Sequence, residues 1–552
     1  MKPLFALVFA ATRLLMPFCF AACLAFGSAS SIYIAQSSAG RANGSSCASA
    51  FAYAFFNSAS NWGGGADQIG PGTTVHICGT VTFPAGSSGL VAQGSGTSAA
   101  PVVIYFESGA VLQSPYFGGT HGCYSQATCM GGIEIYNRSY FVVDGGSNGV
   151  IQNTANGTDL ANQRTSVGVA VMGSADCIII RNLTIQNIYA NDPAGGTDWG
   201  GQYTSDIQVS GTNVAICNNH LGNSRIGILS STSGGSPPVL PLPNCSSRTF
   251  APGMNLFGNT LRDHCWHFQP GGSSTPIVNI FDNDVSGTEN WVYTANESSY
   301  YHTDGVIAWG DTPQLVVYLF DNYFHDSHFG TAQFYCTYGL TGSGCAAYIF
   351  NNVFQYPALN PGTAVWLNGS AGYPLGPYFL YNNTFVNPGY MVLPAGDNLT
   401  MSLENNLVTE GTTGYNYFYA KVYGAASLGS VLAISDYNLF YGGRGLSFTG
   451  AGYWGWPPGS SWGSYSSWTV TGFDAHSIGA NPKLSASYGL LVDSPARRAG
   501  ANLTALCSTA GLAPVCRDKA GVARPSTGAW DIGAYQYAST PAPPTGLTTI
   551  VK

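Results

Sequence analysis

Residues 300–313 read YYHTDGVIAWGDTP and hold His302, Asp304 and Asp311 within ten positions. Only 8% of the residues of this chain are charged, so a stretch with three titratable side chains stands out. A carboxyl group beside an imidazole can donate, accept and hold protons during the reaction of a bound substrate. An Asp-Gly step also forms a good turn before a strand. The stretch therefore has a catalytic and a purely structural interpretation, and the surrounding elements must decide between them.

The charge of the chain limits the class of partner. The 552 residues include 18 Lys and Arg against 26 Asp and Glu, which gives a formal net charge of −8. No Lys or Arg occurs between residues 263 and 420. Nucleic acids and anionic membranes are bound mainly through clusters of Lys and Arg, so we expect neither as a partner.

The N-terminus has the pattern of an export signal. Lys2 and Arg13 precede the apolar stretch LLMPFCFAACLAF, and GSASS supplies small residues for cleavage after Ala29. A retained membrane anchor is the alternative, but the apolar stretch is shorter than the ~20 residues that a membrane-spanning helix requires. We expect residues 1–29 to be a signal peptide and the mature protein to be secreted or at the cell surface. The periplasm is an alternative location, and no membrane association is expected after cleavage.

The cysteines fit an exported protein. A signal peptide that contains Cys19 and Cys23 leaves twelve of the fourteen cysteines, an even number, so disulfides are expected. The short-range pairs predicted are Cys123 with Cys129, Cys336 with Cys345 and Cys507 with Cys516. A zinc site is disfavoured because the sequence contains no CxxC pair.

A repeat organises the middle of the chain. Several apolar residues, a spacer, an asparagine and a further apolar residue recur, as in NIFDNDV, YLFDNYF and YIFNNVF. The anchoring asparagines, at intervals of 23 to 40 residues, are Asn182, Asn219, Asn259, Asn283, Asn322, Asn352, Asn383, Asn406 and Asn438. Strands this short, with turn residues between them and no helical periodicity, bury a continuous core when stacked as successive turns of a coil. In such a coil the asparagines align in one column and hydrogen-bond to their neighbours above and below.

This pattern resembles the right-handed parallel β-helix superfamily of pectate lyases and polygalacturonases, over roughly residues 130–445. The resemblance implies an all-β solenoid, and an antiparallel sandwich or propeller is the alternative. Residues 30–130 are expected to hold an N-terminal cap and the first coils, and residues 131–480 the β-helix. Residues 481–540 resemble the closing segment of bacterial secreted β-helix proteins and are expected to cap the end of the coil. Residues 541–552 form a Pro/Thr-rich tail that is expected to be flexible.

Polar side chains gather at one predicted edge of the coil. Four residues after the asparagine come Asn223, Asp263, Gly287 and Asp326, and six residues after it come Arg225, Cys265, Glu289 and His328. Counting backward aligns DGVIAW with WHFQPG of the preceding coil, so the residues between Gly287 and Thr303 become an inserted loop. The edge then collects five of the nine histidines beside three aspartates: Asp263, His264, His267, His302, Asp304, His325, Asp326 and His328.

Two carboxyl groups at this edge fit glycoside hydrolysis, in which one acts as general acid and the other as base or nucleophile. We expect Asp304 and Asp326 to be this pair, with Asp263 as the substitute for either and His302 and His328 as orienting partners. The expected substrate-binding residues are His264, His267, His325, Arg225, Trp291, Tyr301 and Trp309. No cofactor is required for this chemistry.

The TDG sequence at Asp304 resembles part of the Asn-Thr-Asp-Gly motif of polygalacturonases, in which the aspartate takes part in hydrolysis. His302 replaces the asparagine of that motif, and the chain has neither the Asp-Asp pair nor the Gly-His-Gly sequence of that family. No specific enzyme family is therefore matched.

Two alternatives stay open. A polysaccharide lyase acting on a uronate-containing glycan could use Arg225 and Arg262 as cations and His302 or Tyr301 as base, with calcium held by Asp282 and Asp284 as a further source of positive charge. A non-enzymatic carbohydrate-binding or adhesin-like β-helix could stack sugars on its tryptophans. In each case the expected partner is an extracellular polysaccharide, and the protein is expected to be a monomer.

Overall fold

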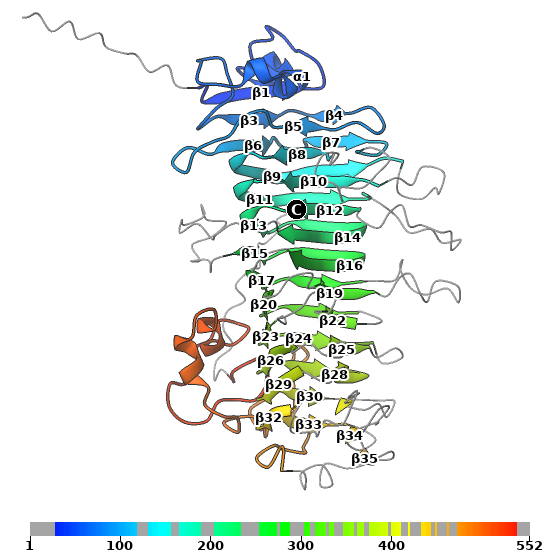
Figure 1. Cartoon of the computed structure of the whole chain (residues 1–552), viewed down its shortest axis with the longest axis vertical. Helices are drawn as coiled ribbons and strands as arrows, with labels where there is room; N and C mark the ends of the chain where they lie inside the picture. Colours follow the sequence, from blue (N-terminus) through cyan, green and yellow to red (C-terminus); the bar gives the residue numbers. More distant parts are fainter. Residues whose placement is uncertain are drawn as a thin grey trace, which may run out of the picture.

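The computed structural model describes residues 28–118, 131–155, 165–188, 204–232, 253–272, 277–287, 303–309, 315–326, 330–335, 346–357, 362–368, 375–395, 399–409, 418–419, 432–442, 448–449, 461–462 and 472–537. Within these ranges the chain is an elongated stack of short strands, one coil above another (Figure 1). No helix in the described ranges has the length and apolarity needed to cross a membrane.

Each coil contributes strands to three faces, and each face is a parallel β-sheet in which the strands of successive coils pair. The first face contains β1 (Ser31–Ala35), β3 (Thr74–Ile77), β6 (Val102–Phe106), β9 (Ser139–Asn153), β11 (Asp176–Gln186), β13 (Thr212–Cys217), β15 (Met254–Phe257), β17 (Ile277–Phe281), β20 (Val316–Phe320), β23 (Ala346–Phe350), β26 (Leu375–Tyr381), β29 (Leu399–Glu404) and β32 (Leu432–Asp436). All strand pairs of this face are parallel.

The second face follows directly after the first in each coil. It contains β4 (Thr80–Thr82), β7 (Val111–Ser114), the ends of β9 and β11, the starts of β14 (His220–Thr232) and β16 (Thr260–Gly272), and then β18 (Asp284–Ser286), β21 (Tyr323–His325), β24 (Val353–Gln355), β27 (Thr384–Val386), β30 (Leu407–Thr409) and β33 (Leu439–Tyr441).

The third face closes each coil. It contains β5 (Leu90–Val91), β8 (Ile133–Tyr136), β10 (Val167–Met172), β12 (Ser205–Val209), the remainder of β14 and β16, β19 (Asp304–Trp309), β22 (Gly330–Tyr335), β25 (Thr363–Asn368), β28 (Tyr390–Ala395), β31 (Phe418–Tyr419) and β34 (Phe448–Thr449), with β35 (Ser461–Trp462) antiparallel to β34. This arrangement confirms the predicted all-β parallel β-helix.

A sharp corner separates the first face from the second. The residue at this corner has a positive φ in successive coils: Asn218, Gly258, Asp282, Asp321, Asn351, Asn382, Asn405 and Tyr437. Asn, Asp and Gly tolerate the left-handed conformation best, which explains their abundance here. The next residue is the buried asparagine that the repeat predicts.

The predicted asparagine ladder is confirmed from Asn219 to Asn438. Each side-chain amide donates to the side-chain oxygen of the asparagine in the next coil at 2.9–3.1 Å, and also to a backbone carbonyl of the preceding coil. Asn182 is the exception. It has φ +57° and occupies the corner position, while Leu183 takes the ladder position and donates its backbone N–H to Asn219.

The interior of the coil is apolar and stacked. Phe324, Phe354 and Phe385 stack inside it with ring centroids 5.4 and 5.1 Å apart. At the first end, the short helix α1 (Ala54–Asn57) and neighbouring 3₁₀ turns place Phe56 and Trp62 against the first coils. A disulfide between Cys47 and Cys78 ties this cap to β3.

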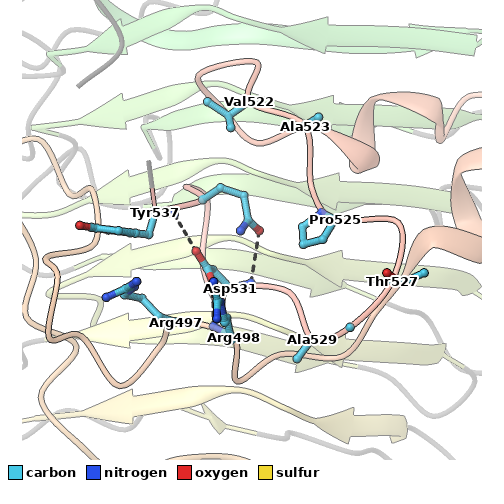
Figure 2. Close-up of a pocket in the computed structure, with 11 residues that line it drawn as sticks. Arg497, Arg498, Val522, Ala523, Pro525, Thr527, Ala529, Asp531 and Tyr537 are labelled. Atoms are coloured by element: carbon cyan, nitrogen blue, oxygen red, sulfur yellow. Dashed lines mark hydrogen bonds between the residues drawn. The ribbon is translucent and has the colours of Figure 1, made fainter. Parts of the chain in front are cut away.

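The C-terminal segment packs on the flank of the coil. The outward side of the first face carries a second stack, Phe257, Phe281, Phe320 and Phe350, with centroids 4.8 Å apart. Leu503, Leu512, Val515 and Trp530 cover this cluster. Residues 496–537 therefore lie along the side of the coil and not over its last turn, where the sequence pattern placed them (Figures 1 and 2).

The corner asparagines hold this segment in place. Asn351 donates to the backbone carbonyl of Arg517 at 2.7 Å, and Asn405 donates to that of Ala501 at 2.9 Å. The predicted disulfide between Cys507 and Cys516 is present in the segment. Cys217 is also disulfide-bonded, and the side chains of Cys177 and Cys265 are buried. The cysteines of the other two predicted pairs lie outside the described residues.

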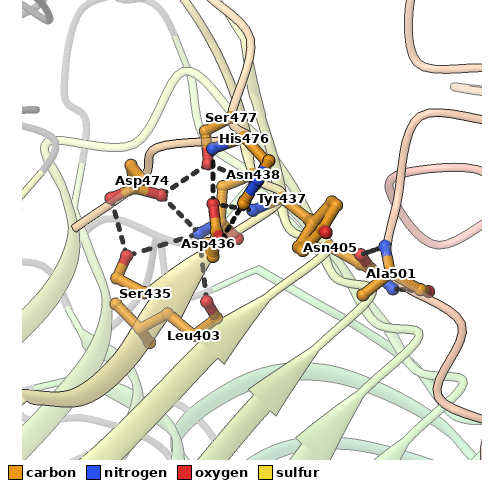
Figure 3. A network of polar contacts seen from close by, with 10 residues as sticks. All are labelled: Leu403, Asn405, Ser435, Asp436, Tyr437, Asn438, Asp474, His476, Ser477 and Ala501. Atoms are coloured by element: carbon orange, nitrogen blue, oxygen red, sulfur yellow. Dashed lines mark hydrogen bonds and ion pairs between the residues drawn. The ribbon is translucent and has the colours of Figure 1, made fainter. Parts of the chain in front are cut away.

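The ladder ends on a carboxylate. The side-chain amide of Asn438 donates to Asp474 Oδ1 at 2.9 Å, and the backbone N–H of Asn438 donates to the hydroxyl of Ser477 (Figure 3). Ser435 donates to the other carboxylate oxygen of Asp474. Residues 474–478 thus satisfy the polar groups of the last ladder coil.

We predict that replacing Asn322 by alanine lowers the thermal midpoint by several degrees. The side-chain oxygen of Asn322 accepts from the backbone and side-chain N–H groups of Asn283, and its amide donates to Asn352. Leaving a buried polar group unpaired costs roughly 1–3 kcal/mol. Differential scanning calorimetry at one scan rate would measure the change, with the exposed Asn148→Ala as control. Equal midpoints for the two variants would contradict a stabilising role for the ladder.

Candidate functional site

Asp263 and Asp326 occupy a second corner of the coil, between the second and third faces. The positions four residues after the ladder have positive φ values of 53–77°: Asn223, Asp263, Gly287, Asp326 and Asn387. The sequence predicted that the residues four positions after the ladder asparagines occupy equivalent places in successive coils. The structure confirms this, and the reason is the left-handed backbone conformation that this position requires. Asp and Asn suit this turn whether or not they also contact a ligand. Asp326 is exposed, and its carboxylate accepts from His325 Nδ1 at 2.7 Å.

Asp304 begins β19, with the register that the sequence predicts. Trp266 pairs with Asp304, and Phe268 pairs with Val306, so DGVIAW lies on WHFQPG. The backbone carbonyl of Asp304 lies 3.4 Å from the Nδ1 atom of His267 in the preceding coil. Asp304 and Asp326 therefore belong to different register columns, because Asp326 is a corner residue and Asp304 is a strand residue.

Asp304 lies on the outward side of the third face. Its column continues to Thr363 and Tyr390, which are partly exposed. The adjacent column continues to Ala364 and Met391, which are core residues. The side chain of Asp304 is nevertheless fully buried, at 0% exposure. A carboxyl group is therefore held out of contact with water at the outer side of this sheet.

Amide and indole groups share this outward side. Gln208 and Trp366 each stand between two core residues in their strands and so face outward, and Gln269 continues the column of Gln208. Gln269 and Trp366 are partly exposed. Amides and indoles are the side chains that commonly hydrogen-bond and stack on small polar ligands. We call Asp304, Trp266, Gln208, Gln269 and Trp366 the outer-face cluster.

Arg225 lies beside Trp266. Its guanidinium carbon is 5.7 Å from the centroid of the indole ring, in the range of a cation–π contact. Arg225 is 5% exposed and Trp266 is 7% exposed. The predicted substrate-binding cation is thus mostly covered.

His264 and His267 are interior residues of the coil. His264 is 0% exposed, and its Nε2 lies 2.8 Å from Asp206 Oδ2, while Ser224 donates to the other oxygen of Asp206. Burial lowers the pKa of both histidines to about 3 and raises the pKa of Asp206 well above its ordinary value. Burial thus disfavours the charged form of all three side chains, and both imidazole rings are closed off from solvent.

His325 joins two carboxylates at the outside of the second face. Its ring nitrogens lie 2.8 Å from Asp284 and 2.7 Å from Asp326. Burial opposes the charge of His325, but hydrogen bonds to the two carboxylates outweigh it and raise the pKa of this histidine. Burial also acts against the charge of Asp284, yet His325 and Arg262 bring its pKa to about 2. His325 thus bridges the two carboxylates, and they favour its charged form.

Several predicted residues lie outside the described part of the chain. These are His302, His328, Trp291 and Tyr301, and of Trp309 only its strand position is described, opposite Gly271 and Tyr335. In the described ranges no group of three or more His, Cys, Asp or Glu side chains is arranged to hold a metal ion. Of the two aspartates considered for calcium, Asp282 is a left-handed corner residue and Asp284 is paired with Arg262 and His325.

The sequence analysis missed Asp206, Gln208 and Gln269. Asp206 and Gln208 lie in the strand SDIQV, where apolar residues alternate with polar ones. That alternation marks Gln208 as outward-facing. No comparable signal marks Asp206, because its interior position results from the bend where the strand begins.

No protein-family model and no curated protein match the sequence. Among solved structures, pectate lyase Pel9A is 14% identical over 92% of this chain and 96% of its own, with a TM-score of 0.42. The complex of XylC with xylose is 9% identical over 92% and 98%, with a TM-score of 0.44. The Family 28 exopolygalacturonase of Yersinia enterocolitica is 13% identical over 64% and 69%, with a TM-score of 0.31.

We predict that His267 makes the protein less stable in acid. In the unfolded chain this histidine binds a proton near pH 6.5, whereas burial lowers its pKa to about 3 in the folded protein. Between these values the unfolded chain holds more protons, so stability present above pH 6.5 is lost as the pH falls, by at most ~1.4 kcal/mol per pH unit. Asp206, whose folded pKa is raised, acts in the opposite direction.

The thermal midpoint should therefore fall less between pH 7 and pH 4.5 in His267→Gln than in the unmodified protein. The exposed His476→Gln serves as the control for loss of a histidine outside the coil interior. An unaltered pH dependence in His267→Gln would remove this assignment.

Proposed function

We propose that this chain is a secreted enzyme that hydrolyses an extracellular polysaccharide, of neutral or weakly charged type. One observation carries the proposal. A carboxyl group, Asp304, is buried on the outward side of a sheet that also presents Gln269 and the indole of Trp366. Burying a carboxyl group costs free energy, so its presence on the side of the sheet that also carries amide and indole groups supports a functional role.

In this mechanism Asp304 is the general acid. Burial disfavours the ionised form of a carboxyl group, which suits a residue that must protonate the glycosidic oxygen. The indole of Trp366 supports the face of a sugar ring, and the amide of Gln269 hydrogen-bonds to its hydroxyl groups. The protein scaffold thus orients the scissile bond over the acid.

Asp326 is the proposed second carboxylate, and Asp263, at the same corner position two coils earlier, is its substitute. The exposed carboxylate of Asp326 is held by His325, which fixes its orientation. An ionised, oriented carboxylate can activate a water molecule or attack the sugar directly. His302 and His328 are the proposed orienting partners.

A lyase is the second candidate because Arg225 lies against Trp266, which pairs with Asp304 in the next coil. A guanidinium group could neutralise the carboxylate of a uronate, which β-elimination requires. The chain between residues 263 and 420 contains no other Lys or Arg to continue such a groove, which favours hydrolysis.

We predict that Asp304→Asn abolishes turnover and leaves the fold intact. The substitution keeps the shape of the side chain and replaces the acidic carboxyl group by an amide that cannot act as a general acid. The secreted protein would be tested on a panel of neutral and acidic polysaccharides, by reducing ends and by the ultraviolet absorbance of unsaturated products. Reducing ends alone indicate a hydrolase, both signals indicate a lyase, and neither signal on any substrate favours a binding protein.

Asp436→Asn is the matched control, since this aspartate pairs with the exposed His476 at the last coil. Circular dichroism and the thermal midpoint would show that each variant is folded. Full activity of a folded Asp304→Asn would reject Asp304 as the acid, and loss of activity in Asp326→Asn but not in Asp263→Asn would identify the base.

A further inference from the structure

A pocket of about 510 Å³ lies within the C-terminal segment, on the flank of the coil. This volume falls in the range of ~300–1,000 Å³ that small-molecule sites occupy. Figure 2 shows Arg497, Arg498, Asp531 and Tyr537 on one side and Pro525, Thr527 and Ala529 on the other. All of these residues belong to a segment that the proposed hydrolysis does not use.

The acidic side chain in this pocket is already satisfied. Asp531 is 3% exposed and accepts from the backbone N–H of Arg498 at 2.7 Å and from that of Tyr537 at 2.6 Å. The buried Arg524 offsets its charge, since the two groups attract each other. Asp531 is therefore hydrogen-bonded and charge-paired within the segment itself.

The two arginines of the rim differ in what holds them. Arg497 lies 3.7 Å from the centroid of the Tyr537 ring and also donates to the carbonyl of Val492. Arg498 is exposed, and within the described ranges its side chain has no hydrogen bond or ion pair. Its backbone has φ +51°, a conformation that is costly for a residue other than glycine and that Asp531 stabilises. The guanidinium of Arg497 is thus held against Tyr537, whereas that of Arg498 is exposed and makes no hydrogen bond or ion pair within the described ranges.

We propose that this pocket binds a sugar that carries an oxyanion, either a carboxylate or a sulfate group. The planar guanidinium of Arg498 can donate two parallel hydrogen bonds to such a group. Arg497 adds a second positive charge, and the segment 481–537 holds 6 of the 18 Lys and Arg residues of the chain. The choice of a sugar as the carrier of the anion rests on the proposed function, with a weakly charged polysaccharide as the substrate, whereas the pocket itself does not depend on Asp304.

The test measures binding to the full-length protein by isothermal titration calorimetry. The probes are tri-galacturonate, a sulfated disaccharide, a neutral trisaccharide and inorganic sulfate. At least one acidic sugar should bind more tightly than the neutral one, and Arg498→Gln should weaken that binding by a factor of about 10 or more. The arm that binds, carboxylate or sulfate, identifies the anion.

Arg517→Gln is the matched control, because Arg517 is an exposed arginine of the same segment outside the pocket. It should leave binding unchanged. Asp304→Asn should also bind normally, so a failure of the hydrolase assignment would be seen separately from a failure of this site. Equal binding of acidic and neutral sugars, no binding at all, or unchanged affinity in Arg498→Gln would overturn the proposal. Inorganic sulfate binding as tightly as the acidic sugars would overturn the role of the sugar.

Discussion

The hydrogen-bonded column of buried asparagines is the constraint on which the other features of the coil depend. At the corner between the first and second faces, the chain bends from one strand into the next within two residues. This length is the same in every coil from Asn259 to Asn438. So tight a turn brings backbone polar groups into the interior, where each needs a partner. The asparagine amide supplies both a donor and an acceptor to neighbouring coils. The other two corners have no such requirement and vary in length.

Two adjacent columns of similar residues therefore have different tasks. The ladder asparagines point inward and connect coil to coil. The corner residues just before them point outward, and Asn351, Asn382 and Asn405 there bind the backbone of the C-terminal segment. The same local conformation thus builds the core and supplies the surface on which the closing segment docks. Burial of Leu512, Val515 and Trp530 on the outward phenylalanine stack completes this contact.

Much of the fold could be predicted from the sequence because the repeat encodes it directly. The spacing of the asparagines predicted the ladder and the pairing of Asp304 with Trp266. Asn182 was assigned to the ladder, but it occupies the left-handed corner one position before it. Asn is favoured at both positions, so the sequence pattern did not distinguish them. The packing of the C-terminal segment on the flank was not predictable, because irregular structure carries no periodic signal for the surface that it covers.

The candidate site was harder to predict for a related reason. Clustering in sequence placed His264 and His267 near Asp304, but it could not tell the inside of the coil from the outside at a bend. Asp263 and Asp326 attracted attention as carboxylates, although their backbone conformation alone accounts for an Asp at that corner. Only strand alternation could have distinguished the side chains of the outer-face cluster from inward-facing ones. Gln208 shows this alternation, whereas Asp304 does not, because it is the first residue of its strand.

The identity of Asp474 has a consequence for the length of the molecule. Every ladder asparagine from Asn219 onward donates its side-chain amide to a side-chain oxygen of the following turn. The column of hydrogen bonds therefore runs in one direction, from the first coil to the last. Asp474 accepts from Asn438, but its carboxyl group has no N–H to donate to a further turn. It acts as a terminator of the solenoid. Whole turns inserted before Asp474 would lengthen the coil while Asp474 still closed the ladder. An asparagine in place of Asp474 would leave a side-chain N–H to which a further coil could bind.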